Sequence, residues 1–172
     1  MLVSASVVLL LVMLSIPGPA RFDSLRISGN PRFQQQVSSA LSLLRGRSPD
    51  GYQIVTNNIG IIAQAKHSGM AAYRDPPTFD LNDRTAFYSV TWCAGSIAHD
   101  SMHSKLYFDY RRAHAGASVP DNVWIGETVE KACTDHQHHV LLQIEAPSNE
   151  IAQCVWNPKD RYWEVDYTKR NW

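Results

Sequence analysis

The chain has 172 residues, and 44% of them are hydrophobic, which is enough for one globular domain with its own core and excludes a disordered chain. Sixteen acidic residues balance 16 basic ones, and no basic run is longer than the Arg111-Arg112 doublet. Nucleic-acid binding requires a concentrated positive surface, so we expect no nucleic-acid partner.

The first 20 residues carry no charged side chain and contain an unbroken apolar run from Val7 to Leu14. Small residues follow at Gly18 and Ala20, as is typical of the positions before a signal-peptide cleavage site. This pattern predicts a secretory signal peptide over residues 1–20 and a single domain over residues 21–172. No lysine or arginine precedes the apolar run, so an uncleaved N-terminal membrane anchor is the alternative.

The first half of the predicted domain combines one helix with short strands. Apolar residues recur at helical spacing over residues 30–44, and residues 48–51 then predict a turn. Isoleucine and valine are frequent over residues 54–65, which indicates one or two strands. Residues 78–81 alternate in polarity and predict a further strand.

The second half is predicted to be mainly helical. A long helix is expected over residues 89–112, and a second one from residue 121 or 122 to the residue before a proline at position 147. A short helix over residues 148–155 and a closing strand over residues 162–167 complete the chain. Because most strands lie in the first half, the sequence predicts an α+β fold.

The pentapeptide His99-Asp100-Ser101-Met102-His103 lies inside the first long helix. Residues four apart share one face of a helix, so His99 and His103 can bind one metal ion together. The Asp100 carboxylate can then reach a water on that ion. This is the layout of the zinc-hydrolase motif His-Glu-x-x-His, with aspartate in place of glutamate, and it predicts a Zn²⁺ site. The alternative is a pair of buried histidines with a structural role.

The motif and the following helix resemble the gluzincin type of metallopeptidase, in which a glutamate on the helix after the motif supplies the third ligand, usually as Glu-x-x-Ala. The segment Glu130-Lys131-Ala132-Cys133 has a small residue three positions after its glutamate. The resemblance therefore implies that Glu130 is the third metal ligand, with Glu127 as the alternate. It also implies a zincin-like fold, in which a small sheet accompanies the motif helix and a glutamate-bearing helix.

By the same resemblance, the chain is expected to be a secreted metallopeptidase acting on a peptide or protein, with Asp100 as the general base. The family has glutamate at this position, and aspartate is one methylene shorter. A secreted metal-binding domain without hydrolysis is therefore the alternative. In zincin-like enzymes a strand edge pairs with the substrate main chain. The strand over residues 59–65 is the candidate here, and an ordinary buried strand is the equal alternative.

A rival assignment uses the His99-Asp100 doublet differently. The same doublet occurs in the HD-domain phosphohydrolases, whose helical metal site would need a further histidine and aspartate. His67 and either Asp109 or Asp135 could supply them. An exported α+β chain favours the peptidase.

Three other groups of side chains have more than one interpretation. His136 and His139 are three apart and could share a metal ion, but a solvated helix face explains them at least as well. In an exported chain the cysteines predict one disulfide, Cys133–Cys154 or Cys93–Cys133, while three buried thiols are the alternative. The aromatic residues are expected to pack in the core or in a lid.

Overall fold

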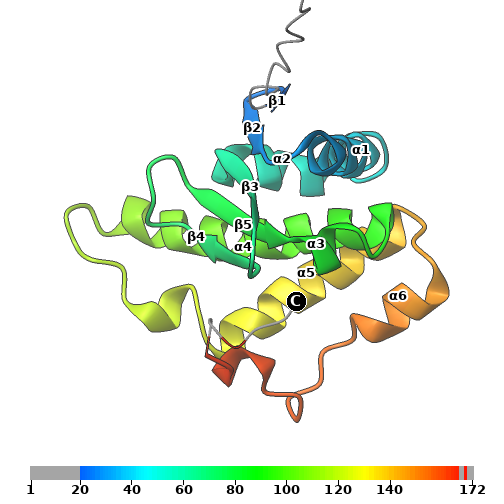
Figure 1. Ribbon diagram of the computed structural model, residues 1–172. Helices are drawn as coiled ribbons and strands as arrows, with labels where there is room; N and C mark the ends of the chain where they lie inside the picture. The colour runs from blue at the N-terminus through cyan, green and yellow to red at the C-terminus, as the bar shows by residue number, and fades with distance from the viewer. Residues whose placement is uncertain (1–19, 167–168, 170–172) are drawn as a thin grey trace, which may run out of the picture.

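The computed structural model describes residues 20–166 and residue 169, and it confirms the predicted α+β fold (Figure 1). Its strands all lie before residue 83, and the longest helix follows them. The α-helices are α1 Pro31–Arg47, α2 Pro49–Asn58, α3 Asp83–Ala86, α4 Val90–Ala113, α5 Glu127–Gln143 and α6 Ser148–Gln153. Two 3-10 helices are η1 Asp121–Val123 and η2 Tyr162–Glu164.

The five described strands form one mixed sheet in the order β1-β2-β3-β5-β4. Their bounds, from β1 to β5, are Ala20–Phe22, Leu25–Ser28, Ile61–Ala65, Gly69–Ala71 and Thr78–Asn82. Strands β2, β3 and β5 are parallel neighbours at the centre, and β1 and β4 are added antiparallel at the two edges. The β1–β2 hairpin was not among the predicted elements.

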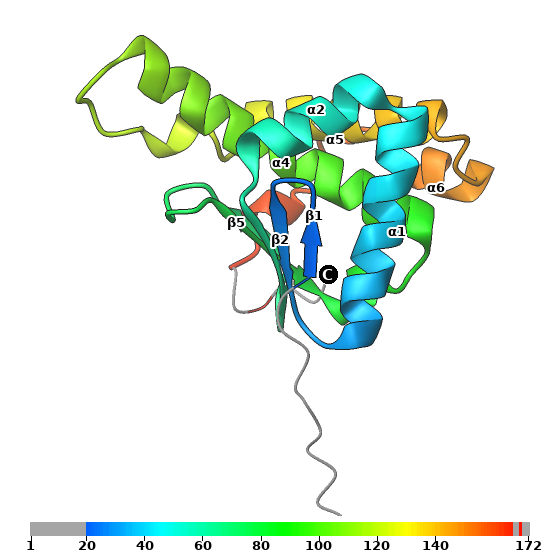
Figure 2. The same cartoon turned by 90° about the horizontal axis from the view of Figure 1, so that it is seen from above.

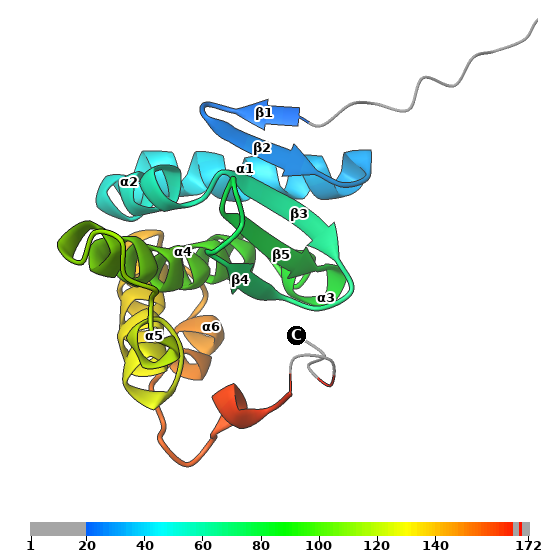
Figure 3. The same cartoon turned by 90° about the vertical axis from the view of Figure 1, so that its left-hand side faces the viewer.

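Helices cover one face of this sheet. In β2, Leu25 and Ile27 are fully buried, whereas Arg26 and Ser28 are exposed, which is the alternation of a strand with one covered face. Figures 2 and 3 show α1, α2 and α4 gathered on the same side of the strands. The fold therefore has one layer of strands and one of helices.

Helix α2 replaces the turn and the first strand that were predicted over residues 48–58. Pro49 lies in its first turn, where the missing N–H of proline leaves no hydrogen bond unmade. The helix packs against α1 and α4 through residues at helical spacing, namely Gly51, Val55 and Asn58. This packing outweighs the strand preference of its isoleucine and valine, so the strand prediction holds only for residues 61–65.

Helix α4 confirms the long helix predicted at residues 89–112. It begins after Ser89, whose Oγ accepts a hydrogen bond from the backbone N of Trp92 at 2.7 Å. The second long helix begins later than predicted, because η1 comes first and Gly126 interrupts the chain with a φ of 99°. Glycine adopts that φ without strain, so the chain can turn there before α5 begins. The third helix is confirmed as α6.

The predicted closing strand over residues 162–167 is wrong where the structure describes this segment. Residues 162–164 form η2, and Tyr167 lies outside the described residues. The alternating aromatic residues make side-chain contacts instead of sheet pairs. Tyr162 Oη lies 3.1 Å from Thr134 Oγ1 of α5, and the rings of Trp156 and Trp163 stack with their centroids 5.0 Å apart.

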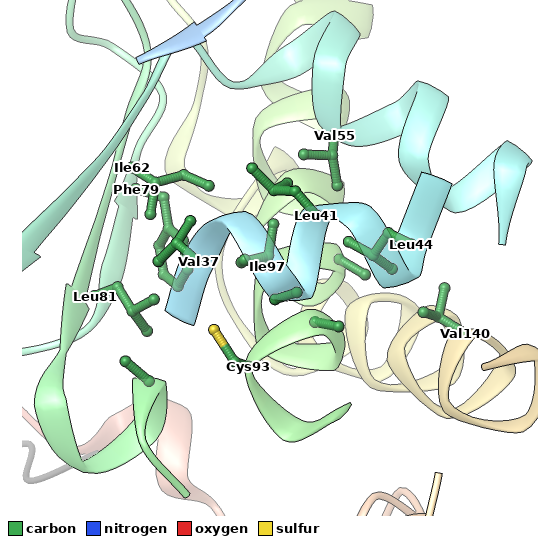
Figure 4. Close-up of a cluster of buried hydrophobic side chains, with 14 of the residues drawn as sticks. Val37, Leu41, Leu44, Val55, Ile62, Phe79, Leu81, Cys93, Ile97 and Val140 are labelled. Atoms are coloured by element: carbon green, nitrogen blue, oxygen red, sulfur yellow. The ribbon is translucent and has the colours of Figure 1, made fainter. Parts of the chain in front are cut away.

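The hydrophobic core lies between the sheet and the helices α1, α2, α4 and α5 (Figure 4). Its members from the sheet and α1 include Ile62, Phe79, Leu81, Val37, Leu41 and Leu44. Helices α4 and α5 approach closely at Gly95, where a Cβ would lie 2.9 Å from Leu141 Cδ2. This close contact holds the histidine-bearing helix against the glutamate-bearing helix.

The predicted signal peptide falls almost entirely outside the described residues, since only Ala20 of residues 1–20 is described. Ala20 is the first residue of β1 and pairs with Ile27. Within residues 20–166, no helix combines the length and apolar character needed to cross a bilayer.

All three cysteines are buried free thiols, so neither predicted disulfide is formed and the alternative of three thiols is confirmed. Cys93 lies in the core, where burial raises its pKa to about 12. Cys154 Sγ lies 3.7 Å from the carbonyl oxygen of Thr134, a distance at which a thiol can donate a weak hydrogen bond.

Two adjacent leucines of α5 allow a matched test of the core. Leu141 is fully buried, whereas Leu142 is 51% exposed. We expect Leu141→Ala to lower the free energy of unfolding by about 2–5 kcal/mol, because it removes buried methyl groups and leaves a cavity. Leu142→Ala should change it by less than about 0.5 kcal/mol. Urea denaturation measures both, and equal losses would contradict this packing.

Candidate metal centre

Helix α4 places His99 and His103 one turn apart on the side that faces α5. Their Nε2 atoms lie 3.2 Å apart, and His103 is buried. Two ring nitrogens directed at each other over this distance repel through their lone pairs unless a proton or a cation lies between them. The histidine pair therefore has the arrangement that a shared cation requires.

Glu130, in the first turn of α5, completes the cluster. Its Oε2 lies 3.3 Å from Nε2 of His99, and its Oε1 lies 3.6 Å from Nε2 of His103. The glutamate is only 6% exposed, and a buried carboxylate needs such partners. Glu127, the alternate, is exposed, so the structure brings Glu130 to the histidines and not Glu127.

The separations in this cluster fit a tetrahedral zinc ion. Zinc bonds to nitrogen and oxygen are about 2.0–2.1 Å long, which puts neighbouring donors of a tetrahedron roughly 3.3–3.4 Å apart. The two histidine Nε2 atoms lie 3.2 Å apart, and they lie 3.3 and 3.6 Å from different oxygens of Glu130, so both carboxylate oxygens face the histidine pair. Two imidazoles and one carboxylate are also the donor types that zinc binds in hydrolases.

The backbone of the η1 segment orients His103. His103 Nδ1 lies 2.7 Å from the carbonyl oxygen of Trp124, the residue that follows η1. Because a carbonyl oxygen can only accept a hydrogen bond, His103 Nδ1 carries the proton. The Nε2 lone pair is then directed toward the cluster, as a metal-binding histidine requires. Nδ1 of His99 is buried without a hydrogen-bond partner.

Tyr162 orients Glu130 from the C-terminal segment. Its hydroxyl donates to Glu130 Oε2 at 3.0 Å and lies 3.1 Å from Thr134 Oγ1. Because the single phenolic proton goes to the carboxylate, Thr134 is the donor in the second bond. The sequence analysis missed Tyr162, since its aromatic neighbours were interpreted as a strand and no spacing linked it to the motif.

Cys133 is a further potential donor. One ligand atom from each of His99, His103 and Cys133 lies within 4.8 Å of the others, so these residues could hold a metal ion. Cys133 lies one turn after Glu130, is fully buried and is not among the residues that line the cavity beside the histidines. Burial is the main reason that its pKa is raised. From the sequence, Cys133 was interpreted as a small residue after Glu130 or as a disulfide partner and not as a metal ligand, although its helical spacing from Glu130 indicated a shared face.

A cavity of about 790 Å³ lies beside the cluster, within the usual size range of small-ligand sites. His99, His103 and Glu130 line it, and half-buried Asp100 lines it too. A substrate in this cavity can therefore contact the predicted general base and the predicted metal ligands together.

The strand at the sheet edge beside this cavity is β4. The prediction that the strand over residues 59–65 forms this edge is therefore wrong. Strand β3 pairs with β2 on one side and with β5 on the other, so its main chain is already bonded on both sides. Strand β4 is the terminal strand of the described sheet and lines the cavity. No strand was predicted at β4, because its glycine and its short length conceal one.

The other predicted metal donors lie elsewhere. Asp109 and Asp135 each pair with a lysine one helical turn away at 2.5 Å, Lys105 and Lys131 respectively. These carboxylates serve as surface ion pairs on α4 and α5. His67 does not line the cavity, although the next residue, Ser68, does. The geometry that the phosphohydrolase assignment needs is thus not formed in the described residues.

His136 and His139 also stay outside the centre. Neither belongs to the group of His99, His103 and Cys133, which could hold a metal ion in the part of the chain that the structure describes. Burial, followed by the neighbouring His139, His99 and Lys105, lowers the pKa of His136 to about 4. Its Nε2 is buried without a hydrogen-bond partner.

The cluster is electrostatically coupled. Burial lowers the pKa of His103, but Cys133 and Glu130 beside the ring raise it by more, so it lies well above its ordinary value. Burial raises the pKa of Glu130, but hydrogen bonds and charge from His103 and His99 lower it by more, so it lies well below its ordinary value. Without a metal, the cluster therefore favours a charged carboxylate beside a protonated imidazole.

Comparison of the chain with protein-family models, with curated proteins and with solved structures gave no match. The interpretation of the centre therefore depends on its own geometry.

The coupling predicts an opposite pH dependence for the metal-free and zinc-loaded protein. The lowered pKa of Glu130 stabilises the metal-free fold above pH 4.5, and the raised pKa of His103 stabilises it below pH 6.5. The unfolding temperature of metal-free protein should fall as the pH rises above 6.5, whereas zinc binding should strengthen because protons no longer compete. Thermal scans with and without zinc measure this. Parallel profiles would contradict the coupling.

The Tyr162 hydrogen bond predicts an effect on metal affinity. Tyr162→Phe removes only the hydroxyl that orients Glu130, so we expect zinc to bind about 10- to 100-fold more weakly. Competition with a coloured chelator measures the dissociation constant. Tyr110→Phe, at the far end of α4, is the matched control and should leave it unchanged. Equal affinities in the two variants would show that Tyr162 does not act on the centre.

Proposed function

We propose that this protein is a zinc-dependent metallopeptidase of zincin-like architecture. The observation that carries the proposal is the convergence of His99, His103 and Glu130 at separations suited to one tetrahedral ion. A buried cluster of this composition is costly to maintain unless its members bind something or one another. The apolar run of residues 7–14 supports export from the cell as part of the proposal.

Each residue has a defined task in this scheme. His99, His103 and Glu130 would hold the ion, and the Trp124 carbonyl and Tyr162 hydroxyl keep two of these ligands oriented. When bound, zinc lowers the pKa of a coordinated water and polarises a carbonyl oxygen. Asp100 lines the same cavity and would accept the proton from the attacking water and pass it to the departing amine.

The substrate main chain would lie along β4. This strand pairs with β5 on one side and is the terminal strand of the described sheet. An extended peptide can add to such an edge through main-chain hydrogen bonds that do not depend on its side chains. Gly69, Met70 and Ala71 all line the cavity, so the added chain would pass beside the metal ligands.

A second function, metal binding without hydrolysis, is favoured by two specific features. Asp100 is shorter than the usual glutamate, so its carboxylate has less reach toward a water. Cys133 offers sulfur to the same two histidines, and cysteine is a common ligand of structural zinc sites.

Substitution of Asp100 separates the two functions. We expect zinc-loaded wild-type protein to cleave fluorescently labelled casein and Asp100→Asn to lose at least about 100-fold in rate, because the general base is gone. The zinc content of Asp100→Asn should stay at one per chain, whereas His103→Ala should lose the metal. Full activity of Asp100→Asn would contradict the assigned base. If the wild-type protein holds zinc but does not cleave casein, and the Asp100→Glu variant does cleave it, the metal-binding alternative is indicated.

A further inference from the structure

The walls of the cavity are rich in tryptophan. Four of the five tryptophans of the chain line it, and the fifth, Trp172, lies outside the described residues. Tyr73, Tyr162 and the buried Phe79 also line it, beside Trp92, Trp124, Trp156 and Trp163. The sequence analysis expected these rings in the core or in a lid, but none of the four tryptophans is fully buried.

These rings form two groups on different segments. Tyr73 contacts Trp124 edge to face, with ring centroids 6.1 Å apart, where the β4–β5 connection meets the η1 segment. Trp156 and Trp163 stack in the C-terminal segment, with an interplanar angle of 21°. Figure 3 shows β4 and η2 one above the other, with α4 and α5 beside them. Both groups line the cavity that holds the metal ligands.

Apolar side chains at this cavity remain in contact with solvent. Three of the six exposed large hydrophobic residues in the described chain line it: Tyr73 at 63%, Val155 at 59% and Ile125 at 42% exposure. Exposed apolar surface concentrated at one cavity is typical of a binding site. A ligand that covers this surface removes it from water, and this removal favours binding.

The charges of the cavity are predominantly negative. Arg74 and Asp80 neutralise each other in an ion pair at 3.0 Å. Three further carboxylates, of Asp100, Glu130 and Asp160, line the cavity, whereas Arg74 is the only lysine or arginine among the described residues that line it. Such a site attracts cationic ligands and repels acidic ones.

We infer that the cavity selects peptides in which bulky aromatic side chains are flanked by basic residues. This inference rests on the proposed function and adds its substrate class. Aromatic side chains of the peptide would pack on the two ring groups, the basic side chains would lie near the carboxylates, and the main chain would follow β4.

Three blocked peptides of equal length test the inference on the full-length, zinc-loaded protein. The first has two adjacent phenylalanines flanked by lysines, the second has alanines in place of the phenylalanines, and the third has glutamates in place of the lysines. Binding is measured by tryptophan fluorescence, and cleavage is measured separately by chromatography. We expect the first peptide to bind at least about tenfold more tightly than either of the others.

Variants locate the effect. Tyr73→Ala and Trp163→Ala should each weaken binding of the first peptide about tenfold, whereas Tyr110→Ala, outside the cavity, should leave it unchanged. Equal binding of the three peptides, or equal effects of all variants, would overturn the inference. Cleavage without preference would overturn it while the proposed function stands. Selective binding without cleavage would support the site and overturn the proposed peptidase.

Discussion

The approach of Glu130 to the paired histidines across the α4–α5 interface is the contact on which the centre depends. Each helix alone offers an incomplete set of donors, because α4 supplies two imidazoles and α5 supplies the carboxylate. Their packing brings all three within 3.6 Å of one another. Gly95 permits this approach, since a side chain there would collide with Leu141. The core therefore fixes the geometry of the centre as well as the stability of the fold.

The parts around this contact act on it from different segments. The backbone carbonyl of Trp124, which follows η1, orients His103, and the hydroxyl of Tyr162 orients the Glu130 carboxylate. Both segments also supply rings to the cavity wall. The same segments therefore position the ligands and shape the space that a substrate would occupy. In the proposed enzyme this arrangement would link ligand orientation to substrate binding, because displacement of either segment would disturb both.

Elements with strong local signals were predictable from the sequence. The long helix predicted at residues 89–112 is present as α4, and the four-residue spacing placed His99 and His103 on one of its faces. Helix α2 was missed because its strand-forming residues are held in a helix by contacts with α1 and α4. Strand β4 and Tyr162 were missed because their roles come from neighbours distant in the sequence, which no local pattern records.

The proposed third ligand comes from a different helix than the two histidines, so no local sequence spacing predicts it. The resemblance to gluzincins indicated Glu130, and its burial beside the histidines agrees with that choice. Cys133 offers sulfur to the same pair of histidines. X-ray absorption spectroscopy of the zinc-loaded protein separates these donors most directly. The account predicts a first shell of nitrogen and oxygen alone at about 2.0–2.1 Å, with imidazole scattering from two histidines, whereas a sulfur shell near about 2.3 Å or a failure to retain zinc would contradict it.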